Sequence, residues 1–126
     1  MTVMNAGVHG LAGKLVPITA LNVRVCRYGR NERLLGRGVL VRPLAAQFED
    51  ETNRLPTFPP SASEPPCPIV PRFFLVTFAS DREQVTIGDP GGCHGVTNGD
   101  LDANPTANWR GELLAATASH DAILKP

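Results

Sequence analysis

The pattern of apolar and polar positions is clearest in the middle of the chain, where residues 73–79 form an aromatic and β-branched run. A polar turn, Ser80-Asp81-Arg82, follows this run, and residues 83–88 return as a second run. Two such runs joined by a short polar turn are typical of a β-hairpin. We therefore expect residues 73–88 to form two antiparallel strands.

A second pair of alternating runs lies nearer the N-terminus, at residues 22–28 and 34–41, with the polar stretch 29–33 between them. Alternation of apolar and polar residues predicts strands with one buried face, so we expect these runs to pair antiparallel as well. Gly36 and Gly38 interrupt the later run. They indicate a bulge or a place where another element approaches the strand closely.

Helical patterns follow each pair of strands. Residues 43–54 are helix formers with Leu44 and Phe48 on one face, and residues 111–119 form a second helical candidate. Residues 56–66 are rich in proline, which excludes a helix or a central strand and predicts a surface connector.

The predicted order is β-β-α-loop-β-β-α, which indicates a small α+β fold: an antiparallel sheet of about four strands with one or two short helices. A chain of 126 residues is long enough for one domain. We assign this domain to residues 21–119. Residues 1–20 are interrupted by glycine and proline and are expected to form a flexible N-terminal arm, and residues 120–126 a C-terminal tail.

The net charge is zero but is unevenly distributed along the chain. Residues 1–48 hold seven Lys and Arg against one acidic residue, a balance of +6, and the remainder carries −6. Nucleic-acid binding through the region from Arg24 to Arg42 is one interpretation, and attraction between two halves of one fold is the other. We favour the second, because the arginines occur singly, without interleaved aromatic residues or a binding motif. Nucleic acid is therefore not the expected partner, and a protein or small-molecule partner stays open.

The chain shows no segment that would take it into or across a membrane. No stretch approaches the ~20 apolar residues of a membrane-spanning helix. The first 23 residues lack the basic region and the unbroken apolar segment of an export signal. We therefore predict no membrane-spanning segment and no signal peptide within this chain, and whether a leader precedes it stays open.

The chain has three cysteines, Cys26, Cys67 and Cys93. Cys67 lies 14 residues before Asp81 and Cys93 lies 12 residues after it, so antiparallel pairing brings both to the open end of the hairpin. We predict a disulfide between Cys67 and Cys93, with Cys26 as a buried thiol. The alternatives are a disulfide from Cys26 to either of the others, or three thiols in a reducing compartment.

Cys93 and His94 form the candidate catalytic pair, because a nearby imidazole can generate a thiolate. Adjacent side chains usually point apart, however, and no third group is positioned by the sequence. A zinc site from Cys26, Cys67, Cys93 and His94 has suitable ligand types but lacks any paired spacing. We therefore predict no catalytic residue, no metal site and no cofactor.

Five short motifs occur in order along the chain: Val25-Cys26-Arg27-Tyr28, Pro66-Cys67-Pro68, Phe74-Leu75-Val76-Thr77-Phe78, Gly92-Cys93 and Thr97-Asn98-Gly99. This succession resembles a group of small exported or lipoprotein-like hypothetical proteins of actinobacteria, over roughly residues 21–115. The resemblance implies an oxidising location in the cell envelope or outside the cell and a structural disulfide. It implies no activity and no catalytic residue.

The function predicted from the sequence is a non-enzymatic, disulfide-stabilised binding or structural module of the cell envelope or exterior. One alternative is a small thiol- or metal-dependent enzyme centred on Cys93 and His94. The other is nucleic-acid binding through the region from Arg24 to Arg42.

Overall fold

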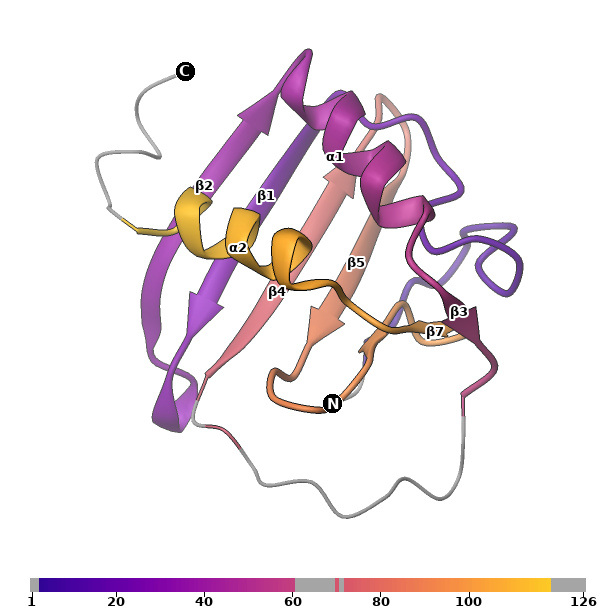
Figure 1. The fold of residues 1–126 in the computed structure, drawn as a ribbon. Coiled ribbons are helices and arrows are strands. Elements are labelled where there is room, and N and C mark those ends of the chain that lie inside the picture. The colour runs from indigo at the N-terminus through magenta and orange to yellow at the C-terminus, as the bar shows by residue number, and fades with distance from the viewer. Residues whose placement is uncertain (1–2, 61–69, 71, 119–126) are drawn as a thin grey trace.

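A computed structural model describes residues 3–60, 70 and 72–118. These residues form two α-helices and a seven-stranded antiparallel sheet with the strand order β2-β1-β4-β5-β6-β7-β3 (Figure 1). The elements in chain order are β1 (Asn22–Tyr28), a 3-10 turn (Arg30–Glu32), β2 (Leu34–Val41), α1 (Leu44–Asn53), β3 (Thr57–Phe58), β4 (Phe73–Ala79), β5 (Gln84–Asp89), β6 (Val96–Thr97), β7 (Asp102–Ala103) and α2 (Ala107–Ala116).

Both predicted strand pairs are confirmed. β1 and β2 pair antiparallel with a continuous register that runs from Asn22 opposite Val41 to Arg27 opposite Gly36. β4 and β5 form the central hairpin, and its turn is closed by the Ser80 amide, which donates to the Glu83 carbonyl at 2.9 Å. β1 also pairs with β4, so the two hairpins join into one sheet.

The predicted fold class is wrong in the number and order of its strands. The described chain is mostly β, with seven strands instead of about four, because β3 follows α1 and both β6 and β7 follow β5. Each of these additional strands is two residues long. A run of two residues is too short for an alternating pattern, so only the pairing with a neighbour reveals it as a strand.

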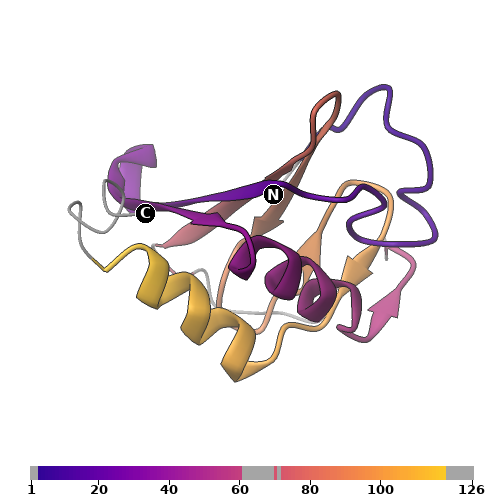
Figure 2. The ribbon, with the colours of Figure 1, turned by 90° about the horizontal axis from the view of Figure 1, so that it is seen from above.

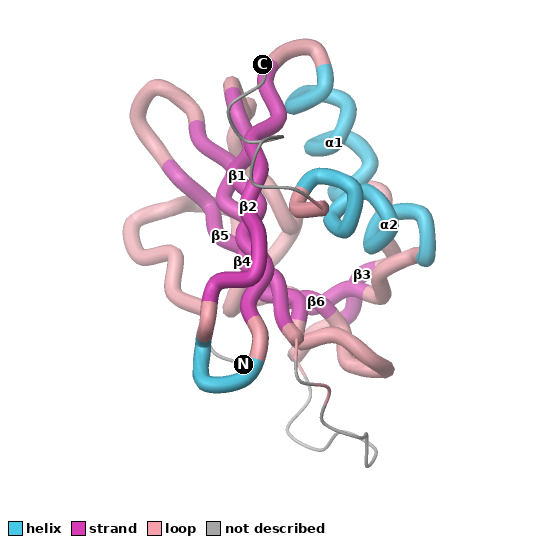
Figure 3. Tube along the Cα trace, turned by 90° about the vertical axis from the view of Figure 1, so that its left-hand side faces the viewer, coloured by secondary structure: helices cyan, strands magenta, loops and turns pink. Residues whose placement is uncertain are grey.

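Both helices lie on the same side of the sheet (Figures 2 and 3). The core fills the space between these two layers, and its centre is an aromatic stack. Phe48 of α1 stacks on Phe78 of β4 and on Trp109 of α2, with ring centroids 5.9 Å and 5.6 Å apart. The Trp109 indole N–H is satisfied inside the core, because it donates to the Thr52 hydroxyl at 2.8 Å.

The helices differ in detail from their predictions. α1 has nearly the expected bounds, but it buries Ala45, Phe48 and Thr52, whereas Leu44 is 53% exposed. α2 begins four residues before the expected start at residue 111. The Thr106 hydroxyl accepts a hydrogen bond from the Trp109 amide at 3.0 Å, which caps the helix at its first turn.

The N-terminal segment, residues 3–21, packs onto the domain, although the sequence predicts a loosely attached arm. Its backbone is held by amide side chains from distant positions. The side-chain amide of Asn98, for example, donates to the carbonyls of both Leu11 and Leu15, at 2.9 and 3.1 Å. Five apolar side chains of the segment belong to the buried core: Leu11, Leu15, Val16, Ile18 and Ala20. The predicted tail, residues 120–126, lies outside the described residues.

Gly36 and Gly38 of β2 face the C-terminal end of α2. A β-carbon at either position would collide with a backbone carbonyl oxygen, that of Thr117 or of Ala116. The close approach predicted from these glycines is therefore confirmed. Arg27 of β1 also donates to the Thr117 carbonyl, at 3.3 Å, which places a positive charge at the end of the helix where carbonyl groups lack partners.

Candidate binding surface

The side of the sheet opposite the helices presents polar and half-buried side chains from β2, β1 and β4. Val23 and Val25 of β1 are fully buried against the helices. Side chains alternate across a strand, so Arg24, Cys26 and Tyr28 point to the opposite side. We call this side the open face, since neither helix covers it (Figure 3).

The strand register sets the neighbours of each side chain on the open face. Arg24 lies opposite Val39 of β2, and Cys26 lies opposite Arg37. The two arginines are thus diagonal neighbours on adjacent strands, a separation within reach of long side chains. On the other flank of β1, Cys26 lies opposite Leu75 of β4.

A hollow of about 350 Å³ opens on this face. Arg24 and Arg37 line it together with the side chains of Tyr28 and Leu75. No carboxylate of the described residues lines the hollow. Arg24 and Arg37 form no ion pair within the described residues, whose ion pairs join Arg54 to Asp50 and Arg110 to Asp89. The hollow therefore combines two unneutralised positive charges with apolar and aromatic walls.

An aromatic pair closes one end of the open face. The rings of Tyr28 and Phe73 stack with their centroids 5.0 Å apart. Burial raises the pKa of the Tyr28 hydroxyl, and the neighbouring Cys26 raises it further through its charge and a hydrogen bond. Tyr28 therefore stays neutral at physiological pH. No local sequence pattern predicts this pair, because the two rings are 45 positions apart and only the pairing of β1 with β4 brings them together.

β2 forms one edge of the sheet, and no further strand of the described chain pairs with it. From Leu35 to Val41 its residues alternate between exposed and covered positions. Four of the seven exposed large apolar side chains of the described chain belong to this strand: Leu34, Leu35, Val39 and Val41. Exposed apolar side chains are thus concentrated beside an unpaired strand edge.

The loop that carries Cys93 and His94 is anchored by an arginine of α2. The Arg110 guanidinium donates two hydrogen bonds to the buried Asp89 carboxylate, at 3.0 and 2.7 Å. It also donates to the backbone carbonyls of Gly92 and His94, at 2.5 and 3.0 Å. This clamp fixes the conformation of the loop through a structural ion pair, which no local sequence pattern predicts.

The described residues decide only those predicted pairings that involve Cys26. Within the described ranges, no two cysteines lie at disulfide distance, and Cys26 is a free thiol. Both alternative pairings through Cys26 are therefore excluded. Cys67 lies outside the described residues, so its predicted pairing with Cys93 is not tested.

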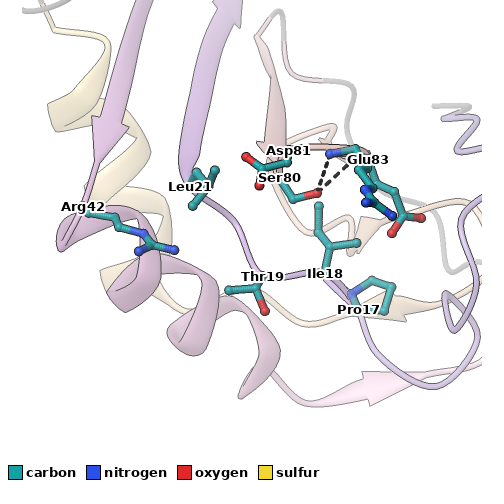
Figure 4. Close-up of a pocket in the computed structure, with 9 residues that line it drawn as sticks. Pro17, Ile18, Thr19, Leu21, Arg42, Ser80, Asp81 and Glu83 are labelled. Atoms are coloured by element: carbon teal, nitrogen blue, oxygen red, sulfur yellow. Dashed lines mark hydrogen bonds between the residues drawn. The ribbon is translucent and has the colours of Figure 1, made fainter.

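No group of three or more metal-ligating side chains occurs in the part of the chain that the structure describes. A larger hollow, of about 500 Å³, lies between residues 17–21 and the turn of the central hairpin (Figure 4). The polar groups of this turn are engaged with one another: the Ser80 hydroxyl accepts from the Glu83 amide at 3.1 Å. This hollow has both signs of charge at its rim, from Arg42, Asp81 and Glu83.

Neither helix of the described chain is long and apolar enough to cross a membrane. Comparison with protein families, with curated proteins and with solved structures found no match. The resemblance to small exported proteins of actinobacteria and the cell compartment that it implies stay predictions.

Proposed function

We propose that the protein is a binding module that holds an extended polypeptide on the exposed side of β2. The observation that carries this proposal is the concentration of exposed apolar side chains on one edge strand, next to a hollow with two unpaired arginines. Interaction surfaces of this kind combine apolar contact area with a polar, charged rim.

The charge of this region supports a polypeptide partner of opposite charge. Residues 21–44 contain six arginines and one glutamate, a balance of +5. Arg24 and Arg37 are both exposed, and their long side chains can bend toward a bound chain. The proposal does not use Cys93 and His94, whose loop is held by the Arg110 clamp.

Selection of peptides from a displayed random library against the folded protein tests this proposal. Val41→Glu places a negative charge on the exposed side of β2, and Leu114→Glu is the matched control, because both side chains are 44% exposed and Leu114 lies on α2. We expect selected peptides to bind Val41→Glu at least about tenfold more weakly than the wild type, and Leu114→Glu with unchanged affinity.

Hydrogen–deuterium exchange of the complex locates the peptide. We expect slower exchange within residues 34–41 when a selected peptide is bound. Peptides that bind both variants equally, protection confined to other segments, or a library that yields no binder would each contradict the proposal.

A further inference from the structure

Resting on the proposed function, we infer that the bound polypeptide adds to β2 as an additional strand and that it is acidic, with a carboxylate opposite Arg37. The first support is the free edge itself. In an antiparallel sheet, alternate N–H and C=O groups of an edge strand point away from the sheet and are available to another chain. β2 is eight residues long, which exceeds the usual strand length of about five to six residues.

The edge of β2 carries few of the devices that usually prevent strand addition. Proline, a bulge or charges that point along the edge are the common protections. Residues 34–41 contain no proline, and the irregularity of register lies at the far end of the strand, between Arg27 and Tyr28 of its partner. The stretch from Gly36 to Val41 is therefore a regular, pairable edge.

Charge decides between the two simplest occupants of this edge. A second copy of the chain would pair β2 with β2, and a symmetric antiparallel pairing centred on Arg37 places the two Arg37 side chains directly opposite each other. Like charges directly opposite or diagonal across strands are destabilising. A chain with acidic residues has the complementary charge, so a second copy is the less favourable occupant.

The order of residues along β2 predicts a sequence pattern for the acidic chain that pairs with it. Residues directly opposite in paired strands point to the same side, so the residue opposite Arg37 lies over the open face beside the hollow. Its neighbours two positions away lie opposite Leu35 and Val39, which are exposed and apolar. The pattern inferred for the partner is therefore apolar-x-acidic-x-apolar in an extended conformation.

The test uses synthetic peptides of about ten residues with the core Val-Thr-Glu-Thr-Val, measured against the full chain by fluorescence anisotropy. A peptide with lysine in place of glutamate and a scrambled peptide without the alternation serve as comparisons. We expect the glutamate peptide to bind at least about fivefold more tightly than either, with affinity that falls as salt concentration rises.

Arg37→Glu tests the predicted contact by exchange of charge. This variant is expected to lose affinity for the glutamate peptide and to gain affinity for the lysine peptide, each by about fivefold. Arg82→Glu, an exposed change of the same net charge in the hairpin turn, is the matched control and is expected to leave both affinities unchanged. Equal behaviour of the two variants would overturn the predicted contact.

Backbone methylation tests strand addition. In an added strand, one alternate set of amide groups faces β2 and the other faces solvent. N-methylation of one set is therefore expected to weaken binding by at least about tenfold, whereas methylation of the other set has little effect. Equal sensitivity of the two sets would reject strand addition.

The outcomes separate this inference from the proposed function. If peptides without acidic residues bind to residues 34–41 as tightly as the glutamate peptide, the acidic partner is rejected and the proposed function stands. If no peptide binds the exposed side of β2, both fail. Tighter binding of a ten-nucleotide oligothymidylate, or a concentration-dependent dimer in sedimentation that the peptides do not dissociate, would also overturn the inference.

Discussion

The side-chain amide of Asn53 pairs with the backbone of Val16 in both directions. The Val16 amide donates to the Asn53 Oδ1 at 2.8 Å, and the Asn53 Nδ2 donates to the Val16 carbonyl at 3.0 Å. In a sheet, a neighbouring strand would bond to the same two groups, the N–H and the C=O of Val16. Here the side chain of Asn53, at the end of α1, takes the place of that strand, because the segment around Val16 has no regular structure of its own.

Loss of this pairing should destabilise the protein. We expect Asn53→Ala to lower the free energy of unfolding by about 2 kcal/mol, because two backbone groups around a buried valine lose their partners. Asn108→Ala is the matched control, since its amide is exposed and bonds to Glu51 only, and it should change stability by less than about 0.5 kcal/mol. Urea unfolding measures both. Equal effects of the two substitutions would contradict the role of Asn53.

The clamp between Arg110 and Asp89 should contribute strongly to stability. Asp89 is fully buried, so Arg110→Met would leave its carboxylate without a charged partner. We expect a loss of about 3 kcal/mol in the free energy of unfolding, measured by urea, together with faster proteolysis within residues 90–95. Arg54→Met breaks an ion pair whose side chains are 77% and 62% exposed and should cost less than about 1 kcal/mol. A stable Arg110→Met variant would show that the clamp is dispensable.

Substitution of two glycines by alanine should change the stability of the protein in opposite directions. Gly38→Ala places a β-carbon against the Ala116 carbonyl and should lower the midpoint of thermal unfolding, because α2 must move away from β2. Gly111→Ala has open space around the new carbon and lies within α2, so it should raise stability by about 1 kcal/mol through helix propensity. Calorimetry measures the midpoint of thermal unfolding of both variants. A shift of the two midpoints in the same direction would be inconsistent with the packing of α2.

Stability should depend on the protonation of Glu112. Burial, then the hydrogen bond to Glu51 and the charge of Glu51, raise the pKa of Glu112 to about 7, from an ordinary value of 4.5. The folded state therefore holds the proton more tightly than the unfolded state. This contribution to stability is complete below about pH 4.5 and is lost as the pH rises to about 7.

Replacement of the Glu112 carboxyl should remove its contribution to the pH dependence of stability. Glu112→Gln is expected to gain stability relative to the wild type as the pH rises from 4.5 to 7, by less than about 1 kcal/mol because solvent screens this exposed side chain. Glu83→Gln, a change of equal charge in the hairpin turn, controls for the net charge. Parallel pH profiles for Glu112→Gln and the wild type would refute the prediction.

The long strands could be predicted from the sequence because their alternation is local. Val23 and Val25 alternate with Arg24 and Cys26, and this pattern alone places one set inside and the other outside. The start of α2 was missed because the chain up to Asn108 is mostly polar and shows no helical period, although Thr106 is a good capping residue at the true start. The N-terminal segment was missed because its apolar residues have no period.

The candidate binding surface was only partly accessible from the sequence. The arginines between residues 24 and 42 are visible as a run of positive charge, but the sequence does not say which of them share a side. Arg27 turns toward the end of α2, whereas Arg24 and Arg37 meet on the open face. Which strand forms the edge depends on pairing between distant segments, and local patterns do not encode that order.

The hydrogen bonds of the N-terminal segment also set an order of events during synthesis. The carbonyl of Leu11 is satisfied by Asn98, and the amide of Ala20 by Glu49. Those partners leave the ribosome dozens of residues later, and Asn98 does so only after the central hairpin has been made. Leu11, the earliest of these residues to be translated, therefore cannot form its final hydrogen bond until the turn at Asn98 has emerged.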